Sequence, residues 1–132
     1  MSTSNYIKER DQDLYRCYRL AWEDPDVKTH EDAVKRAVAS PTRKYWISHY
    51  QAYRAILSIR KGRVIRGDSP RADMLRAIWD NYQSLEKKST FAGASPFFIA
   101  QFAIALPAPR FFISYSRALS IIAKQKRCHH IR

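Results

Sequence analysis

The sequence predicts an all-α protein built of two tandem three-helix units, an internal duplication packed as one compact helical domain over residues 1–132. A repeated stretch is the first observation that predicts it. Residues 34–56 and 100–122 align with seven identities in 23 positions, where ordinary residue usage gives about one or two. Apolar residues at helical spacing are the second observation, and Ser or Thr caps in front of them are the third.

The most similar part of the repeat is an eight-residue segment that reads Pro-x-x-basic-aromatic-aromatic-Ile-Ser. It occupies residues 41–48 and again residues 107–114. Upstream, the residues Asp-Leu-Tyr-Arg from Asp13 resemble Asp-Met-Leu-Arg from Asp73, at a spacing of sixty instead of sixty-six. These registers place two trihelical repeats, the first at residues 9–62 and the second at residues 69–127.

The first repeat is expected to contain three helices. The first of them has an apolar face made of Leu14, Cys17, Tyr18, Ala21 and Trp22, and Pro25 ends it. Thr29 caps a second helix that runs to Pro41. An extended segment then leads to Ser48, which caps a third helix, and Gly62 ends that helix.

The second repeat is expected to follow the same order. Ser-Pro pairs at residues 69–70 and 95–96 begin its first two helices. The second of these runs to Leu106 and is apolar on nearly every side, so we expect it to be the most buried element, packed against both repeats. The core stripe of the first comprises Leu75, Ile78, Trp79, Tyr82 and Leu85.

Composition points to a folded, basic chain. Hydrophobic residues make up 45% of the 132 and the net charge is +12, which excludes a disordered chain. Residues 1–32 carry five basic and eight acidic side chains, whereas residues 33–132 carry nineteen and four. The positive electrostatic potential of residues 33–132 attracts nucleic acid, an anionic membrane surface or an acidic protein. Because we find no signal peptide and no membrane-spanning run, we expect a cytoplasmic protein with no membrane partner.

No enzymatic signature is present. Three glycines are too few for a phosphate-binding loop of the usual kind, and the histidines have no metal-ligand spacing. The tripeptide Cys128-His129-His130 is a weak candidate for a soft metal, because a chain terminus is a poor place to build a site. We therefore expect no enzymatic activity, no cofactor and no bound metal.

The two tandem units with capped third helices resemble tandem helix-turn-helix, homeodomain-like modules over residues 9–127. The repeated Pro-x-x-basic-aromatic-aromatic-Ile-Ser segment also resembles one found in a family of small basic bacterial proteins. The first resemblance implies DNA binding through the third helix of each unit. The eight residues 40–47 depart from the usual helix-turn-helix, whose turn has about three or four residues.

The polar sides of the two third helices carry the candidate nucleic-acid-binding residues. Their spacing is identical at an offset of sixty-six: Gln51, Arg54, Ser58 and Lys61 in the first helix, and Arg117, Ser120, Lys124 and Arg127 in the second. Guanidinium groups suit guanine, amides suit adenine and ammonium groups suit phosphate. An ordinary solvated helix face would also be polar. Arg63 and Arg66, in a flexible basic linker, are candidates for phosphate contacts.

Two aromatic pairs add a further candidate surface. Tyr45-Trp46 and Phe111-Phe112 could stack on bases of a single strand, but we expect at least one ring of each pair to anchor the core.

The favoured function is non-enzymatic binding of duplex DNA, as in a small transcriptional regulator or a mobile-element accessory protein. The alternative is a helical adaptor or assembly protein that binds an acidic protein partner, with Trp46, Trp79 or residues 97–106 as anchors. The target sequence, the choice between DNA and RNA, and the oligomeric state stay open.

Overall fold

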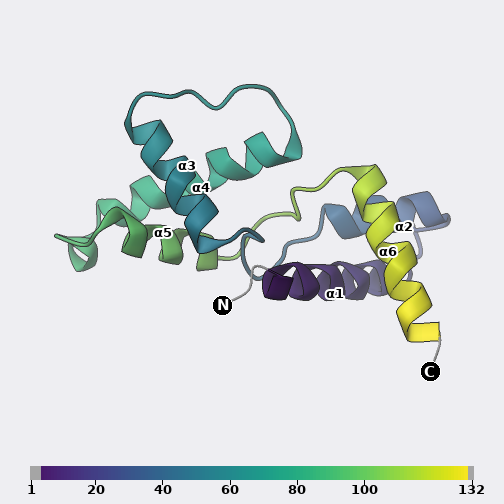
Figure 1. Ribbon diagram of the computed structural model, residues 1–132. Helices are drawn as coiled ribbons and strands as arrows, with labels where there is room; N and C mark the ends of the chain where they lie inside the picture. Colours follow the sequence, from purple (N-terminus) through teal and green to yellow (C-terminus); the bar gives the residue numbers. More distant parts are fainter. Residues whose placement is uncertain (1–3, 131–132) are drawn as a thin grey trace. The chain divides into compact units, whose positions relative to one another are not determined.

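The computed structural model describes residues 4–130 and is all-helical over that range (Figure 1), which confirms the predicted all-α class. Six α-helices follow one another, with a short 3-10 helix after the fourth. They are α1 (Ser4–Ala21), α2 (His30–Val38), α3 (His49–Arg60), α4 (Pro70–Glu86), η1 (Ser89–Phe91), α5 (Pro96–Ala105) and α6 (Tyr115–His130).

Local capping explains where most helices begin. In each case a Ser or Thr hydroxyl accepts the backbone N–H three residues on, and such a cap stabilises a helix by about 1 kcal/mol. The caps are Thr29 to Asp32 at 3.1 Å, Ser48 to Gln51 at 3.1 Å, Ser69 to Ala72 at 3.1 Å, Ser95 to Phe98 at 3.2 Å and Ser114 to Arg117 at 3.1 Å. The starts predicted for α2 to α5 are confirmed.

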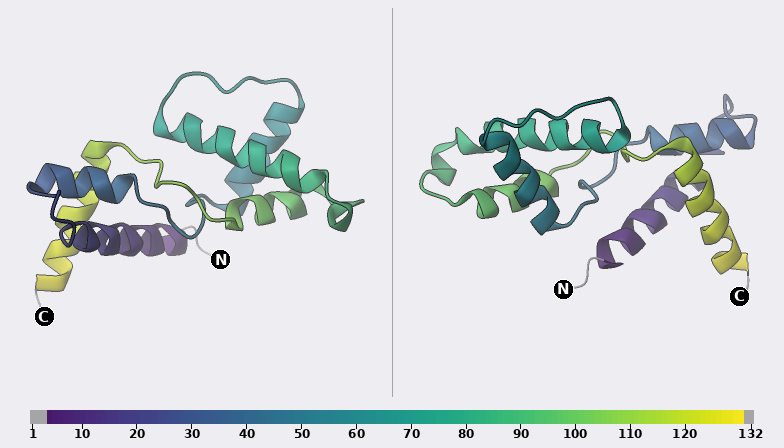
Figure 2. Two further views of the ribbon diagram at one scale, coloured as in Figure 1. Left: turned by 180° about the vertical axis from the view of Figure 1, so that it is seen from behind. Right: turned by 45° about the horizontal axis from the view of Figure 1, so that its top comes forward.

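The helices pack as two units that do not coincide with the sequence repeats. Unit 1 comprises Met1–Thr42 with Pro109–Arg132, and unit 2 comprises Arg43–Ala108. In unit 1, α6 packs on α1 and α2, and in unit 2, α3 packs on α4 and α5 (Figures 1 and 2). The third helix of each repeat therefore packs with the first two helices of the other. We call this arrangement the third-helix exchange.

Matched backbone hydrogen bonds fix the exchanged segments. The Tyr45 N–H donates to the Ile104 carbonyl at 2.9 Å, within unit 2, and the Phe111 N–H donates to the Val38 carbonyl at 3.1 Å, within unit 1. Donors and acceptors are both sixty-six residues apart. Pro restricts its own φ and disfavours helix in the residue before it. The segments before α3 and α6 are accordingly not helical, and each leads the chain from one unit into the other.

The aromatic pairs of these segments lie in the core. Tyr45 and Trp46 are buried in unit 2, and Phe111 and Phe112 are buried in unit 1. The expectation that the pairs anchor the core is confirmed, and none of the four rings presents an exposed face on which a base could stack.

One prediction about burial is confirmed in part, and another was wrong. As predicted, α5 packs against helices of both repeats, α3 and α4, and four of its ten residues are buried. It nevertheless exposes Phe97, Phe98 and Phe102 at 39–48%, and Leu106, directly after its end, is 38% exposed. A helix in a three-helix unit buries one side, so apolar character all round does not imply burial all round. Trp22 is 43% exposed because it lies in the turn after the last residue of α1.

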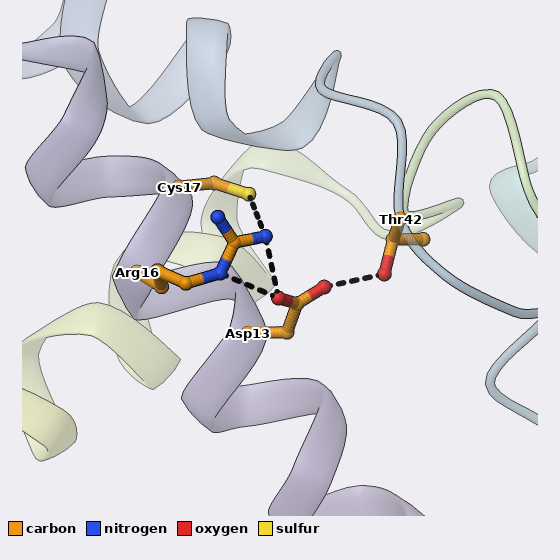
Figure 3. A network of polar contacts seen from close by, with 4 residues as sticks. All are labelled: Asp13, Arg16, Cys17 and Thr42. Atoms are coloured by element: carbon orange, nitrogen blue, oxygen red, sulfur yellow. Dashed lines mark hydrogen bonds and ion pairs between the residues drawn. The ribbon is translucent and has the colours of Figure 1, made fainter.

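A polar network joins Thr42, which follows α2, to α1 (Figure 3). Asp13 accepts hydrogen bonds from Arg16 Nε at 2.9 Å and Nη2 at 2.8 Å, and from the buried Thr42 hydroxyl at 2.5 Å. Arg16 Nη2 also donates to Cys17 Sγ at 3.7 Å. The Asp13 carboxylate is largely buried, so these donors offset the loss of its hydration. The same hydrogen bond to Asp13 raises the pKa of Arg16.

Cysteine reactivity offers a test of the unit 1 core. Cys17 is 6% exposed and Cys128 is exposed, and burial raises the pKa of the Cys17 thiol. Because the thiolate is the nucleophile, we expect a chromogenic disulfide reagent at about pH 8 to titrate one of the two thiols in the native protein. A Cys128→Ser variant should then react only after denaturation. Two fast-reacting thiols in the native protein would contradict this packing.

Candidate nucleic-acid interface

The polar face of α3 lies on the side of the helix opposite its buried apolar residues. Ala52 and Ile56 are buried in unit 2, so the side chains turned away from them face solvent. Gln51, Arg54 and Lys61 are exposed and Ser58 is partly exposed. The Arg54 guanidinium lies over the ring of the exposed Tyr50, with 5.7 Å to its centroid, which orients it without neutralising its charge.

The polar face of α6 has the same construction in unit 1. Ala118, Ile121 and Ile122 are buried, and the exposed residues are Arg117, Ser120, Lys124 and Arg127. Residues 109–132 contain six basic side chains and no acidic one. The sequence therefore supplies α6 with no acid of its own at helical i, i+3 or i, i+4 spacing.

Several cations outside these two faces are held in ion pairs. Lys35 pairs with Glu31 at 2.8 Å and Arg76 with Asp73 at 3.0 Å, and Arg36 pairs with Asp24. The backbone N–H of Asp26 and then Arg36 hold the pKa of Asp24 below its usual range. Over residues 4–130, no ion pair joins an acid to Arg54, Lys61, Arg117, Lys124 or Arg127. The charge of both faces is thus available to an external anion.

The connection between α3 and α4 holds the remaining candidates. Arg63 and Arg66 are exposed, as expected for phosphate contacts. The neighbouring Arg60 is engaged differently, because it donates to the Tyr82 hydroxyl at 2.7 Å and lies 3.4 Å from Glu86. It therefore braces α3 against α4. Burial is the main cause that raises the pKa of Tyr82.

Sequence reasoning missed Arg76, which holds this connection. Its Nη2 donates to the Ile65 carbonyl at 3.2 Å and also to the Gly67 carbonyl, so the segment expected to be flexible is tied to α4. A signal was present in the repeat of Asp-x-x-Arg, since Arg16 pairs with Asp13 as Arg76 pairs with Asp73.

The ten candidates fall into two groups. Unit 2 brings together Gln51, Arg54, Ser58, Lys61, Arg63 and Arg66, and unit 1 brings together Arg117, Ser120, Lys124 and Arg127. Within the described residues, no three His, Cys, Asp or Glu side chains gather closely enough to hold a metal ion. The side chains of His129 and His130 lie outside that description.

None of the helices between residues 4 and 130 combines the length and the apolar character that crossing a membrane requires. No family model matches the chain, and no curated protein or solved structure is significantly similar to it.

Proposed function

We propose that this protein binds duplex DNA without catalysing a reaction, and that the polar faces of α3 and α6 contact the nucleic acid. The observation that carries the proposal is the exposure of both faces with cations that pair with no acid in the described chain. Such cations bind phosphates with release of condensed counterions, which favours association at low salt. A setting in the bacterial cytoplasm, as a small regulator or mobile-element accessory protein, belongs to the same proposal.

The proposal includes an internal duplication of one three-helix unit, which would supply two equivalent reading helices. Three correspondences support it: the identical 3, 4, 3 spacing of the two polar faces, the paired Asp-x-x-Arg ion pairs and the matched hydrogen bonds of Tyr45 and Phe111. A helix of this length fits the major groove, where Arg reads guanine, Gln reads adenine and Lys contacts phosphate.

Fluorescence anisotropy with labelled duplex DNA tests the proposal. We expect binding that weakens steeply between about 50 and about 200 mM salt. An Arg117→Gln, Lys124→Gln, Arg127→Gln triple variant should reduce the magnitude of the salt slope by up to about 3, since each lost phosphate contact removes about 0.9. Far-ultraviolet circular dichroism should show an unchanged helix content, because all three side chains are exposed.

A matched control removes cations that already have acidic partners. The Lys35→Gln, Arg36→Gln variant lowers the net charge by two within α2, where both cations are ion-paired, and should leave the salt slope near that of the natural protein. The Arg54→Gln, Lys61→Gln variant also lowers the net charge by two, but on the polar face of α3, and it should reduce the salt slope. If the two double variants had equal effects on the salt slope, the assignment of the polar faces as the DNA-contacting surface would be wrong. If the natural protein did not bind DNA at low salt, the whole proposal would be wrong.

One specific observation supports the alternative function, an adaptor that binds a protein partner. Phe91, Phe98 and Phe102 form a surface cluster on η1 and α5, with ring centroids 5.0–6.3 Å apart, and surface clusters of this kind often mark protein interfaces. Trp46 is buried and is withdrawn as an anchor. A protein partner that stays bound after nuclease treatment, and is lost in a Phe98→Ser, Phe102→Ser variant, would favour this alternative over DNA binding.

A further inference from the structure

The connection between α3 and α4, residues 61–69, is fixed at its start. The Gly62 N–H donates to the Ile59 carbonyl at 2.9 Å and the Arg63 N–H donates to the Ser58 carbonyl at 3.2 Å. These two bonds form a Schellman motif, which requires a left-handed residue such as Gly62, whose φ is 100°. The backbone that carries Arg63 is therefore tied to the end of α3.

Arg76 fixes the middle of the same connection. Its guanidinium reaches from α4 to the carbonyls of Ile65 and Gly67, while its Nη1 donates to Asp73 Oδ1 at 3.0 Å. The planar fork of an arginine serves several acceptors at once, which the single ammonium group of a lysine does not reproduce. Arg66 lies between the two held carbonyls, so its backbone position is set by Arg76.

The far end is closed by the α4 cap, in which Ser69 accepts the Ala72 N–H at 3.1 Å. Between these anchors the side chains of Arg63, Val64 and Arg66 are exposed, and Asp68 is the one acid of residues 61–69. A segment held at its start, middle and end loses less conformational freedom when its arginines are immobilised on a ligand.

We infer that this connection is a preformed phosphate-contacting loop, in which Arg63 and Arg66 contact nucleic-acid phosphates and Arg76 is the positioning residue that maintains its shape. The inference rests on the proposed DNA-binding function. It assigns to Arg76 an indirect role, because its guanidinium is turned toward three acceptors of its own unit.

A double-mutant cycle separates positioning from direct contact. Arg76→Lys keeps the positive charge but loses the fork, so it should raise the Kd for duplex DNA roughly three- to tenfold at low salt. In an Arg63→Gln, Arg66→Gln background the same change should leave the Kd unaltered, because the side chains that it positions are already gone. Arg71→Lys, a charge-preserving change at an exposed arginine of the α4 start, is the matched control and should have no such effect.

A second variant disturbs the loop without touching Arg76. Gly67 has a φ of 82° and open space around its missing Cβ, so Gly67→Ala disfavours the native backbone and nothing else. It should reproduce the weakening caused by Arg76→Lys and show the same coupling to Arg63 and Arg66. Equal losses of affinity for Arg76→Lys in both backgrounds would overturn the positioning role while leaving DNA binding in place.

Backbone relaxation measured by NMR gives a readout that needs no DNA. Order parameters at residues 63–68 should lie near those of the flanking helices, at about 0.85, and fall toward about 0.6 in Arg76→Lys. A loop equally mobile in both proteins would overturn the inference. If the natural protein does not bind DNA at low salt, the phosphate role falls together with the proposed function, whereas an additive cycle in a protein that binds removes only this inference.

Discussion

Replacing Ile122 with alanine is expected to open unit 1 and to leave unit 2 folded, although Ile122 belongs to the second sequence repeat. The side chain is fully buried in unit 1, where α6 packs on α1 and α2. A buried Ile→Ala change costs about 2–5 kcal/mol, which is a roughly 30- to 5,000-fold rise in the population of the open state. A unit of this size has little stability in reserve.

Hydrogen exchange resolved by peptide measures this outcome. Protection should fall in α1 and α2 while α4 and α5 keep theirs, and Cys17 of a Cys128→Ser background should become reactive. Ile56→Ala is the matched control, because Ile56 is the equivalent residue of α3 and is buried in unit 2. It should reduce protection in α4 and α5 instead. Loss of protection in α4 and α5 upon Ile122→Ala would contradict the third-helix exchange.

Two fragments of equal length provide the second large effect. Residues 43–108 and residues 67–132 each span 66 positions and each contain α4 and α5, but only the first contains α3, on which both helices pack. We expect residues 43–108 to fold as a monomer with a cooperative thermal transition. Residues 67–132 should be largely unfolded at low concentration, because α4 and α5 lack the helix that covers them.

Circular dichroism melts and sedimentation of the two fragments decide between the outcomes. Concentration-dependent folding of residues 67–132 would agree with the exchange, since two copies could then cover each other with α6. A monomeric 67–132 fragment as stable as 43–108 would contradict it, because α6 would have turned back onto α4 and α5 within one chain.

Helix positions were predictable because the signals that set them are local. Hydroxyl caps and apolar periodicity act within a few residues. The helix starts predicted from Thr29, Ser48, Ser69 and Ser95 therefore agree with the N-caps in the structure. The exposed polar faces of α3 and α6 followed from the same periodicity. Their exposure was predicted, whereas their role in DNA binding remains a prediction.

Packing partners were not predictable because the two third helices share their central core residues. Ala52 and Ile56 of α3 match Ala118 and Ile122 of α6, so these two positions give no preference for one pair of helices over the other. The non-helical segments before α3 and α6 lead each of these helices into the other unit. The repeated Asp-x-x-Arg pattern signalled the pairing of Arg76 with Asp73, but its contacts with the α3–α4 connection were not predictable, because the two carbonyls lie nine and eleven residues away.

Unit 2 is continuous in sequence and lies between the two segments of unit 1, which affects the order in which the helices can pack during synthesis. Residues 43–108 form a contiguous packing unit that can close while synthesis is still under way. α1 and α2, made earlier, must wait for α6, which is translated after all of unit 2. α1 and α2 are thus expected to be buried later than the helices of unit 2, although they are synthesised before them, and a nascent chain stalled before residue 115 should expose them to chaperones.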